Sequence, residues 1–501
     1  MKENLKSISR RSFIGTTGTI AAGLTILPNT VISGLGHKAP SDKLNIAGIG
    51  VGGMGNANLK RLKSENIVAL CDVDWGYCTQ NKVFEEYPGA KWYWDFRKMY
   101  DEMGKSIDAV VVATADHTHA TVAANAMAMG KHAYVQKPLT HSVYESRLLT
   151  KLAAKHKVAT QMGNQGSSDE GVNLTIEWLQ NGEIGDVTKV ETFTDRPIWP
   201  QGLNRPSKGE WVEAEKLNWD LFIGPAQMRP YNSIYTPWNW RGWWDFGTGA
   251  LGDMACHIMH PVFKGLKLQY PVKAQGSSTL LLTDCAPTAQ MVTLKFPERV
   301  APKGAKMKYP AVEVIWYDGG IQPPKPAGWP AGKNMNDAGG GVIFHGTRDK
   351  LICGCYGVRP WLLSGRVPNA PKTERRVEKA MEGGHEMDWV RACKESPDSR
   401  VMTKSDFSEA GPFNEMVVMG VLAVRLQALN KELEWDGPRM QFTNIKDDET
   451  LKICIEDAFS IKDGHPTFNK KWTEPMNAKQ FANEMIKHNY RAGYTLPDMP
   501  A

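Results

Sequence analysis

The chain has 501 residues, of which 42% are hydrophobic, 23% charged and 9% aromatic. These values exclude disordered, collagen-like and coiled-coil proteins, and the length suits two or three domains of ~100–200 residues each. The mean hydropathy of -0.40 excludes a polytopic membrane protein. Most of the net charge of +6 belongs to residues 1–40, which alone carry +4. The remainder is nearly neutral and has no basic run, so we expect no nucleic-acid partner.

The first forty residues are interpreted as an export signal. Arg10 and Arg11 precede a weakly apolar run from Ile14 to Leu27, which is shorter than the ~20 residues of a membrane span. This arrangement resembles a twin-arginine signal cleaved near residues 30–40, and the alternative is an uncleaved anchor or tail. We therefore expect a periplasmic protein without a stable membrane span, exported already folded around its cofactor. Its eight cysteines would fold in a reducing compartment, which favours free, buried thiols.

A dinucleotide-binding motif begins at Leu44. An apolar strand is followed by the G-x-G-x-x-G pattern of residues 50–55 and by a helix-like segment. In this context the glycines permit a tight turn, a close approach to the pyrophosphate and close packing of the helix. A second apolar strand ends at Asp72, 22 residues after Gly50, where a carboxylate accepts from the ribose hydroxyls and repels a 2′-phosphate. NAD is therefore expected as the cofactor, bound here by Gly50, Gly52, Gly53, Met54, Gly55 and Asp72.

Strands and helices then alternate up to residue 165. The expected strands cover 67–71, 107–114, 132–135 and 158–162, and the expected helices cover 120–129 and 143–155. This alternation predicts a doubly wound parallel sheet, that is, a Rossmann domain over residues 41–165, whose ligands bind at the carboxyl ends of the strands. The residues at those ends complete the expected cofactor site: Thr114, His117, His119, Gln136, Lys137, Asn164 and Gln165. The alternative for His117 and His119 is that they cap the following helix.

The sequence pattern changes after residue 165. Runs of alternating apolar and polar residues near 187–195, 289–296, 312–317, 342–345 and 351–355 predict a large, mostly antiparallel open sheet. Expected helices near 250–264, 386–393 and 413–429 would cover one face of it. The predicted fold class is thus α/β, with a Rossmann domain, a substrate and catalytic α/β domain over residues 166–436, and an extension over residues 437–501 that wraps back.

Several motifs now resemble those of the Gfo/Idh/MocA oxidoreductase family. They are Gln136-Lys137-Pro138, the segments 114–119 (TADHTH) and 252–257 (GDMACH), and the stretch 407–436. The resemblance covers residues 44–436 and implies oxidation of a sugar or polyol at the interface of the two domains. It also implies a homo-oligomer, a dimer or a tetramer. Gln136 stands where the family usually has Glu.

The residues also suggest a chemistry. Oxidation of a secondary alcohol requires a base for the hydroxyl proton, and Asp253 and His257 are spaced i, i+4 on one helix face. We expect His257 to be the general base, Asp253 to orient it and raise its basicity, and Lys137 to polarise the substrate oxygen and relay the proton. The alternative is an ordinary exposed helix pair. The histidines at 117, 119, 257 and 260 lack the partners of a zinc motif, so no metal is expected.

A tryptophan-rich segment, WNWRGWW from Trp238 to Trp244, precedes the expected catalytic helix. Flat aromatic rings suit the C–H faces of a pyranose, although packing is an equally ordinary role for tryptophan. The expected substrate residues are Arg196, Arg241 and Trp244, with Trp199 as a weaker candidate.

These observations predict an exported NAD-dependent oxidoreductase that oxidises a secondary hydroxyl of a sugar or glycoside, with 3-keto glycosides among its products and with a tightly bound cofactor. One alternative is an NAD-dependent glycosidase acting through a 3-keto intermediate. Such relatives typically have Arg in the glycine loop and lack the lysine, so Met54 and Lys137 favour the dehydrogenase. The other alternative is a non-catalytic periplasmic sugar-binding protein with a relic dinucleotide site.

Overall fold

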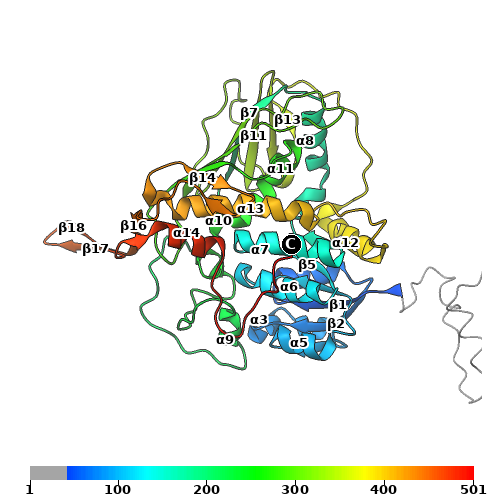
Figure 1. The fold of residues 1–501 in the computed structure, drawn as a ribbon, viewed down its shortest axis with the longest axis vertical. Helices are drawn as coiled ribbons and strands as arrows, with labels where there is room; N and C mark the ends of the chain where they lie inside the picture. Colours follow the sequence, from blue (N-terminus) through cyan, green and yellow to red (C-terminus); the bar gives the residue numbers. More distant parts are fainter. Residues whose placement is uncertain (1–41, 501) are drawn as a thin grey trace, which may run out of the picture.

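The computed structural model describes residues 42–500, so the expected export signal lies outside the described residues. Two sheets and their helices form two layers of the molecule, with helix α13 (Phe407–Arg425) between them (Figure 1). None of the helices in the described part of the chain is long and apolar enough to cross a membrane. All eight cysteines are free and buried, as expected.

The first sheet is a Rossmann sheet. Within residues 42–500 it has six parallel strands in the order β3-β2-β1-β4-β5-β6. Its strands are β1 (Asn45–Ile49), β2 (Asn66–Cys71), β3 (Lys91–Tyr93), β4 (Ala109–Val112), β5 (His132–Val135) and β6 (Thr160–Met162). The central strand β4 is buried at every residue, as expected for a strand covered on both faces. The predicted doubly wound parallel sheet is confirmed, although β3 was not predicted.

Helices cover this sheet on both sides. They are α2 (Met54–Arg61), α3 (Trp75–Gln80), α4 (Val83–Glu86), α5 (Phe96–Met103), α6 (His119–Ala128) and α7 (Val143–His156). The strand order reverses between β1 and β4. A crevice therefore opens at the carboxyl ends of these two strands, where doubly wound sheets bind their ligands.

The second sheet is mixed and mostly antiparallel. Within the described residues it has nine strands in the order β13-β12-β11-β7-β10-β9-β8-β14-β15, and β7 and β10 pair in parallel. The strands are β7 (Val187–Thr194), β8 (Lys273–Ser278), β9 (Gln290–Phe296), β10 (Val312–Tyr317), β11 (Gly340–Gly346), β12 (Lys350–Gly354), β13 (Trp361–Leu362), β14 (Leu433–Asp436) and β15 (Gln441–Phe442). The predicted open sheet is confirmed. Strand β8 was missed because its sequence, KAQGSS, has no β-branched or aromatic residue.

Helices α8 (Glu170–Gln180), α10 (Gly249–Ile258) and α11 (His260–Gly265) complete this part of the molecule. Helix α12 (Gly384–Lys394) was expected to cover the second sheet, but it packs against the Rossmann domain, where Trp389 and Val390 join the core around Ile46. The single helix expected over 250–264 is divided at Met259. Pro261 has no N–H with which to continue the hydrogen-bond ladder of α10, so a new helix starts there. This break leaves α10 as a short, fully buried helix between the two sheets.

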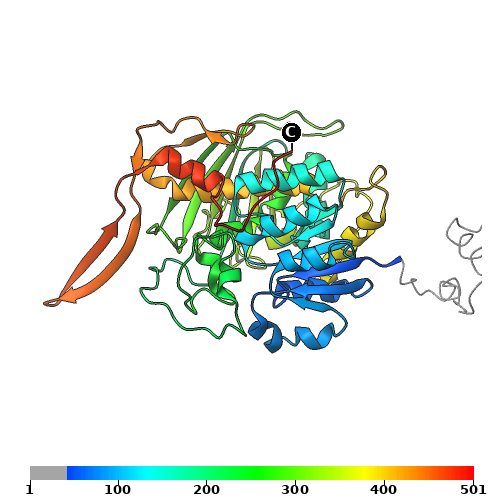
Figure 2. The same cartoon turned by 60° about the horizontal axis from the view of Figure 1, so that its bottom comes forward.

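The chain after β15 first leaves the body of the molecule and then returns to it. Strands β17 (Cys454–Lys462) and β18 (His465–Trp472) form a hairpin that projects from the body, with the short strands β16 (Thr450–Leu451) and β19 (Met476–Asn477) at its base (Figures 1 and 2). Helix α14 (Ala478–Ile486) follows. The last residues run past α9 (Trp219–Ile223) and end near α7. There the Lys151 Nζ donates to the Pro500 carbonyl over 3.1 Å.

Candidate active site

A cavity of about 380 Å³ lies at the carboxyl ends of the parallel strands. One end is formed by the glycine loop and by residues that follow β2 and β3. The other end is formed by Lys137 after β5, by α10 and by loops of the second domain. The cavity thus joins the expected cofactor residues to the expected catalytic residues.

The glycine loop closes tightly against its surroundings. Gly50 has a φ of 79°, and a Cβ on it would lie 2.6 Å from the backbone of Ala113. A Cβ on Gly52 would lie 2.6 Å from the Tyr77 ring, and one on Gly55 would lie 2.0 Å from the Gly50 carbonyl oxygen. Helix α2 starts at this loop, and its first turn has no side-chain cap. Its free N–H groups therefore suit the phosphates of a dinucleotide.

Two carboxylates lie beside this loop. Asp72 Oδ2 accepts from the backbone N–H groups of Val51 and Gly52 over 2.6 and 2.9 Å, which fixes the loop to β2. Asp74, which the sequence reasoning missed, lines the same cavity and caps α3. Burial, with a smaller contribution from the charge of Asp72, raises the pKa of Asp74 to about 6. Two acidic residues here disfavour a 2′-phosphate, which agrees with NAD as the cofactor.

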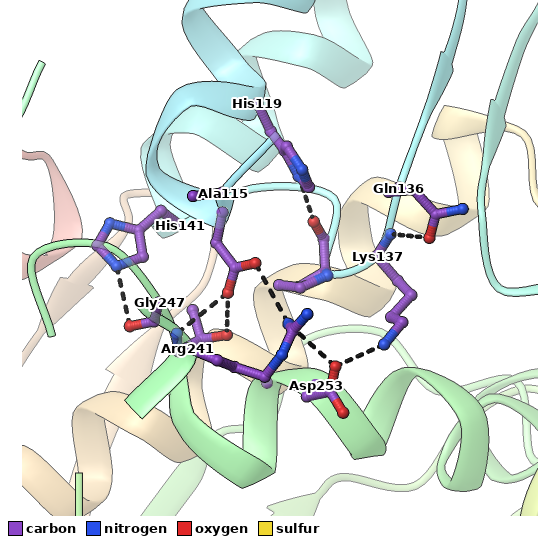
Figure 3. A network of polar contacts seen from close by, with 12 residues as sticks. Ala115, His119, Gln136, Lys137, His141, Arg241, Gly247 and Asp253 are labelled. Carbon is purple, nitrogen blue, oxygen red and sulfur yellow. Dashed lines mark hydrogen bonds and ion pairs between the residues drawn. The ribbon is translucent and has the colours of Figure 1, made fainter. Parts of the chain in front are cut away.

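Lys137 and Asp253 meet at the other end of the cavity. The Lys137 Nζ lies 2.5 Å from Asp253 Oδ1, and the Arg241 Nη1 lies 3.0 Å from the same oxygen (Figure 3). Burial alone would raise the pKa of Asp253, but the charges of Arg241 and Lys137 outweigh it and lower this pKa. Asp253 is therefore ionised, and its Oδ1 is occupied by the two cations.

A second carboxylate, Asp116, holds Arg241 from the Rossmann side. Its Oδ1 lies 3.6 Å from the Arg241 Nη1. Its Oδ2 accepts from the backbone N–H and the hydroxyl of Thr248 over 3.1 and 2.8 Å. Because Thr248 immediately precedes α10, Asp116 fixes the start of this helix to the end of β4. The sequence motif TADHTH contains Asp116, but nothing local distinguishes it from its neighbours.

The structure corrects one expectation about His257. Within the described residues, neither of its ring nitrogens makes a hydrogen bond, and its Nδ1 is buried. Asp253 does not orient it, because the Asp253 carboxylate is directed at Lys137 and Arg241. Burial, followed by the charge of Lys137, lowers the pKa of His257 well below its usual value. The imidazole is therefore neutral and can accept a proton, and the Tyr356 ring, 4.6 Å away between centroids, packs against it.

Several residues expected in the cofactor site do not line the cavity. His119 places its Nδ1 2.8 Å from the Pro138 carbonyl oxygen and its Nε2 3.1 Å from that of Thr114, so it ties the ends of β4 and β5 together. Asn164 donates to the carbonyl of Cys256 in α10 over 3.4 Å, because α10 covers the end of β6. Gln165 is buried beside it. Gly55 packs against Gly50 instead of facing the cavity. The expected cofactor residues that do line it are Gly50, Gly52, Gly53, Met54, Asp72, Thr114, His117, Gln136 and Lys137.

Gln136 has a defined place in the wall of the cavity. Its Nε2 donates to Asn58 Oδ1 over 2.8 Å, and the Nδ2 of Asn58 donates to Glu386 Oε1 over 2.8 Å. Glu386 also accepts from Arg61. The amide of Gln136 thus supplies the donor for the acceptor oxygen of Asn58. This chain explains why Gln, and not Glu, precedes Lys137 here.

Trp244, the tryptophan expected to contact the substrate, does not line the cavity. Trp244 is 4% exposed and donates its Nε1 to the Leu282 carbonyl over 3.2 Å, so it belongs to the core. Trp199, Trp238 and Trp240 line the cavity instead, together with the expected residues Arg196 and Arg241. The side chain of Trp238 is 53% exposed. The cavity thus has an aromatic and cationic wall.

Tyr356 and Ala338 complete this wall, and the sequence reasoning identified neither. Both have left-handed backbones, with φ values of 62° and 57°. They are joined through Asp337, whose carbonyl accepts from the Cys355 N–H over 2.9 Å. Non-glycine residues in this conformation are uncommon and concentrate at functional sites. No group of His, Cys, Asp or Glu side chains in residues 42–500 is arranged to hold a metal ion.

The fold and the cavity define an NAD-binding Rossmann domain joined to a second α/β domain. Residues 44–164 match the NAD-binding Rossmann domain of the Gfo/Idh/MocA oxidoreductase family, and residues 187–300 match the C-terminal alpha/beta domain of that family. Two segments of the chain, one in each domain, are therefore similar to the two domains of that family.

Curated relatives are similar over part of the chain. A glycosyl hydrolase family 109 protein of Shewanella pealeana is 25% identical over 41% of this chain and 50% of its own length. The scyllo-inositol 2-dehydrogenase (NAD(+)) of Bacillus subtilis is 27% identical over 36% of this chain and 53% of its own. An alpha-N-acetylgalactosaminidase of Bacteroides fragilis is 29% identical over 32% and 40%. The chain thus spans about half the length of such relatives or less.

Among solved structures, the WlbA dehydrogenase of Bordetella pertussis, in complex with NADH and UDP-GlcNAcA, has a similar fold. It is 13% identical, with a TM-score of 0.52 over 79% of this chain and 99% of its own. At this identity the likeness concerns the fold alone.

Proposed function

We propose that this protein is an NAD-dependent dehydrogenase that oxidises a secondary hydroxyl of a sugar or glycoside while holding its cofactor tightly. One observation carries the proposal. Neutral His257 and the Lys137–Asp253–Arg241 cluster line the same cavity as the glycine loop and Asp72. A proton acceptor and a cation for the substrate oxygen are thereby combined with a dinucleotide site, as this reaction requires.

The residues of the site have separate roles in this reaction. The glycine loop, the first turn of α2 and Asp72 would hold NAD, which when bound supplies the acceptor for the hydride. Lys137 donates a hydrogen bond to the substrate hydroxyl oxygen and stabilises the negative charge that develops on it. His257 takes the hydroxyl proton. Asp253, ionised between two cations, keeps Lys137 in place and limits the excess positive charge near His257.

The wall of the cavity supports a cyclic polyol or sugar as the substrate. Trp199, Trp238 and Trp240 offer flat apolar faces, and Arg196 and Arg241 offer donors for hydroxyl groups. The similarity to a scyllo-inositol 2-dehydrogenase and to an alpha-N-acetylgalactosaminidase, whose names specify a cyclic polyol and a sugar, supports the same substrate class.

The experiment follows the redox state of the bound nucleotide. Purified protein is mixed with a panel of polyols and glycosides, NADH is monitored by its absorbance, and products are analysed for keto sugars. Reduction by at least one member of the panel is expected. If nucleotide binds but none of these substrates changes its redox state, the dehydrogenase proposal is wrong and the sugar-binding alternative gains support.

A glycosidase acting through a keto intermediate is the second candidate, because several curated relatives are named glycosyl hydrolase family 109 proteins. The same assay separates the two functions. A glycosidase releases the aglycone with no net accumulation of NADH, whereas a dehydrogenase accumulates NADH and a keto glycoside that retains its aglycone.

We also propose that the protein is periplasmic, because residues 1–40 contain the twin-arginine pattern. Export of the full chain and its loss when Arg10 and Arg11 are both replaced by Lys would support it; appearance of the double variant in the periplasm would contradict it. The expected homo-oligomer stays a prediction.

A further inference from the structure

The last residues of the chain form part of the cavity that holds the cofactor residues. Tyr494 is 8% exposed and lines this cavity near Trp94, Asp95 and Phe96, which follow β3. This is the end of the cavity where Asp72 and Asp74 lie. Residues 490–500, here called the strap, cross the molecule between α9 and the helices of the Rossmann domain (Figures 1 and 2).

One side of the strap is fixed to α9. The Arg491 guanidinium bonds Asp220 twice, through Nη1 to Oδ1 over 2.5 Å and through Nη2 to the backbone carbonyl over 2.9 Å. Its Nε donates to the Gly224 carbonyl over 3.0 Å. The backbone N–H of Arg491 donates to the Pro225 carbonyl over 2.9 Å. Arg491 thus attaches the strap to α9. Leu221 and Phe222 of α9 also line the cavity.

The other side of the strap is fixed to the Rossmann domain. The Arg97 Nη1 donates to the Gly493 carbonyl over 2.8 Å, and the Arg97 guanidinium lies 4.5 Å from the centroid of the Tyr494 ring. The Asp95 carboxylate accepts hydrogen bonds from the Nε and Nη2 of Arg97 and holds this guanidinium in place. At the start of the strap, the Tyr490 hydroxyl donates a hydrogen bond to the carboxylate of Glu145 in α7.

We propose that the strap retains the dinucleotide in the protein between turnovers, with Tyr494 as a binding residue for its adenosine half. The strap joins the two walls of this end of the cavity, so a dinucleotide can leave on that side only after the Tyr494 ring has been displaced. Displacement of the ring breaks its contact with Arg97, and displacement of the whole strap breaks the Arg491 contacts as well. This inference deepens the proposed function by giving a cause for tight cofactor binding. It rests on NAD binding and not on the sugar chemistry.

The dissociation rate of NADH from the full-length protein tests the inference. NADH fluorescence is followed after mixing the loaded protein with excess NAD, in the absence of any substrate. Tyr494→Ala is expected to raise the dissociation rate about tenfold to hundredfold, because an aromatic contact and its cation–π partner are lost. Tyr494→Phe keeps the ring and is expected to stay within about twofold of the parent. Arg491→Ala keeps the Tyr494 ring but removes side-chain contacts between the strap and α9. We expect it to give an intermediate rise in the dissociation rate of NADH.

Asn489→Ala is the matched control, because Asn489 is exposed, precedes the strap and makes no hydrogen bond within residues 42–500. Its dissociation rate should equal that of the parent. Equal rates for the parent, Tyr494→Ala and Arg491→Ala would overturn the proposal. If Tyr494→Ala does not fold, Arg491→Ala, whose side chain is partly exposed, carries the test alone. Failure here leaves the dehydrogenase proposal intact, since the turnover of Lys137→Ala tests that function separately.

Discussion

The Lys137 Nζ lies 2.5 Å from Asp253 Oδ1, and this contact joins the two domains across the cavity. Lys137 follows the last residue of β5 by two positions, whereas Asp253 belongs to α10. Both side chains are largely withdrawn from solvent, at 13% and 7% exposed. A buried charge needs a partner, and the Asp253 carboxylate has two, Lys137 and Arg241.

Replacement of Lys137 by Ala should abolish most of the turnover. Without the ammonium, the substrate oxygen loses the donor assigned to polarise it, and we expect kcat to fall by about 10²–10⁴-fold, the range for a residue that aids proton transfer. KM should change little by comparison. Steady-state kinetics with the best substrate of the panel gives both values. Lys137→Arg is the matched control, because it keeps a positive charge beside the Asp253 carboxylate while altering the geometry of the donor. Turnover of Lys137→Ala within a few fold of the parent would contradict the assigned role.

His257 should act as a base over an unusually wide pH range. A general base must be neutral, and a lowered pKa keeps the imidazole neutral as the pH falls below the ordinary value of about 6.5. We therefore expect kcat/KM to stay level as the pH drops from alkaline values through 6.5, where an ordinary histidine would already lose activity. His257→Asn should lower kcat by about 10²–10⁴-fold. The pH profile of kcat/KM measures the first effect, and a decline centred near pH 6.5 in the parent, but absent from the variant, would contradict it.

Asp74 should contribute to the choice of NAD over NADP. Its pKa of about 6 means that it is ionised at pH 8 and mostly protonated at pH 5. The repulsion of a 2′-phosphate by Asp74 should therefore weaken as the pH falls. We expect Asp74→Asn to narrow the ratio of the two dissociation constants at pH 8 by about tenfold, and to narrow it less at pH 5. Calorimetric titration with both dinucleotides gives the ratios.

The titration of the 2′-phosphate itself occurs in parent and variant alike, so the comparison between them removes it. An identical ratio in both proteins at pH 8 would show that Asp72 alone sets the preference.

The first half of the site could be predicted because its signals are local. The strand, glycine loop, helix and Asp72 lie within residues 44–72, so their spacing alone predicts the structure. Lys137 and His257 were found through chemistry and family resemblance. Asp116 could not be singled out, because its function depends on Thr248, 132 residues away. Tyr494 depends in the same way on Arg97 and on the return of the chain over the cavity.

The tryptophan segment shows a second limit. Trp240 and Trp244 lie four residues apart, a spacing that would place them on the same face of an α-helix. Residues 239–242 instead form a short 3-10 turn, and Trp243 is extended. Trp240 consequently faces the cavity, whereas Trp244 enters the core. No periodicity in the sequence distinguishes the two, since both are aromatic and both neighbour charged residues.

Gln136→Glu should destabilise the protein in a pH-dependent manner. The new side chain has the same size, but it would turn an acceptor toward Asn58 Oδ1 and add a buried negative charge near Glu386, which is fully buried. We expect a loss of about 2–3 kcal/mol in the free energy of unfolding at pH 8. Burial would raise the pKa of the new carboxyl in the folded state, so the folded protein binds the extra proton first and the loss shrinks as the pH falls. Gln136→Met removes the hydrogen bond without adding charge, and its smaller loss should not vary with pH. Urea unfolding of the three proteins at pH 8 and 5 measures these differences, and equal stability of Gln136→Glu and the parent at pH 8 would contradict the donor role of Gln136.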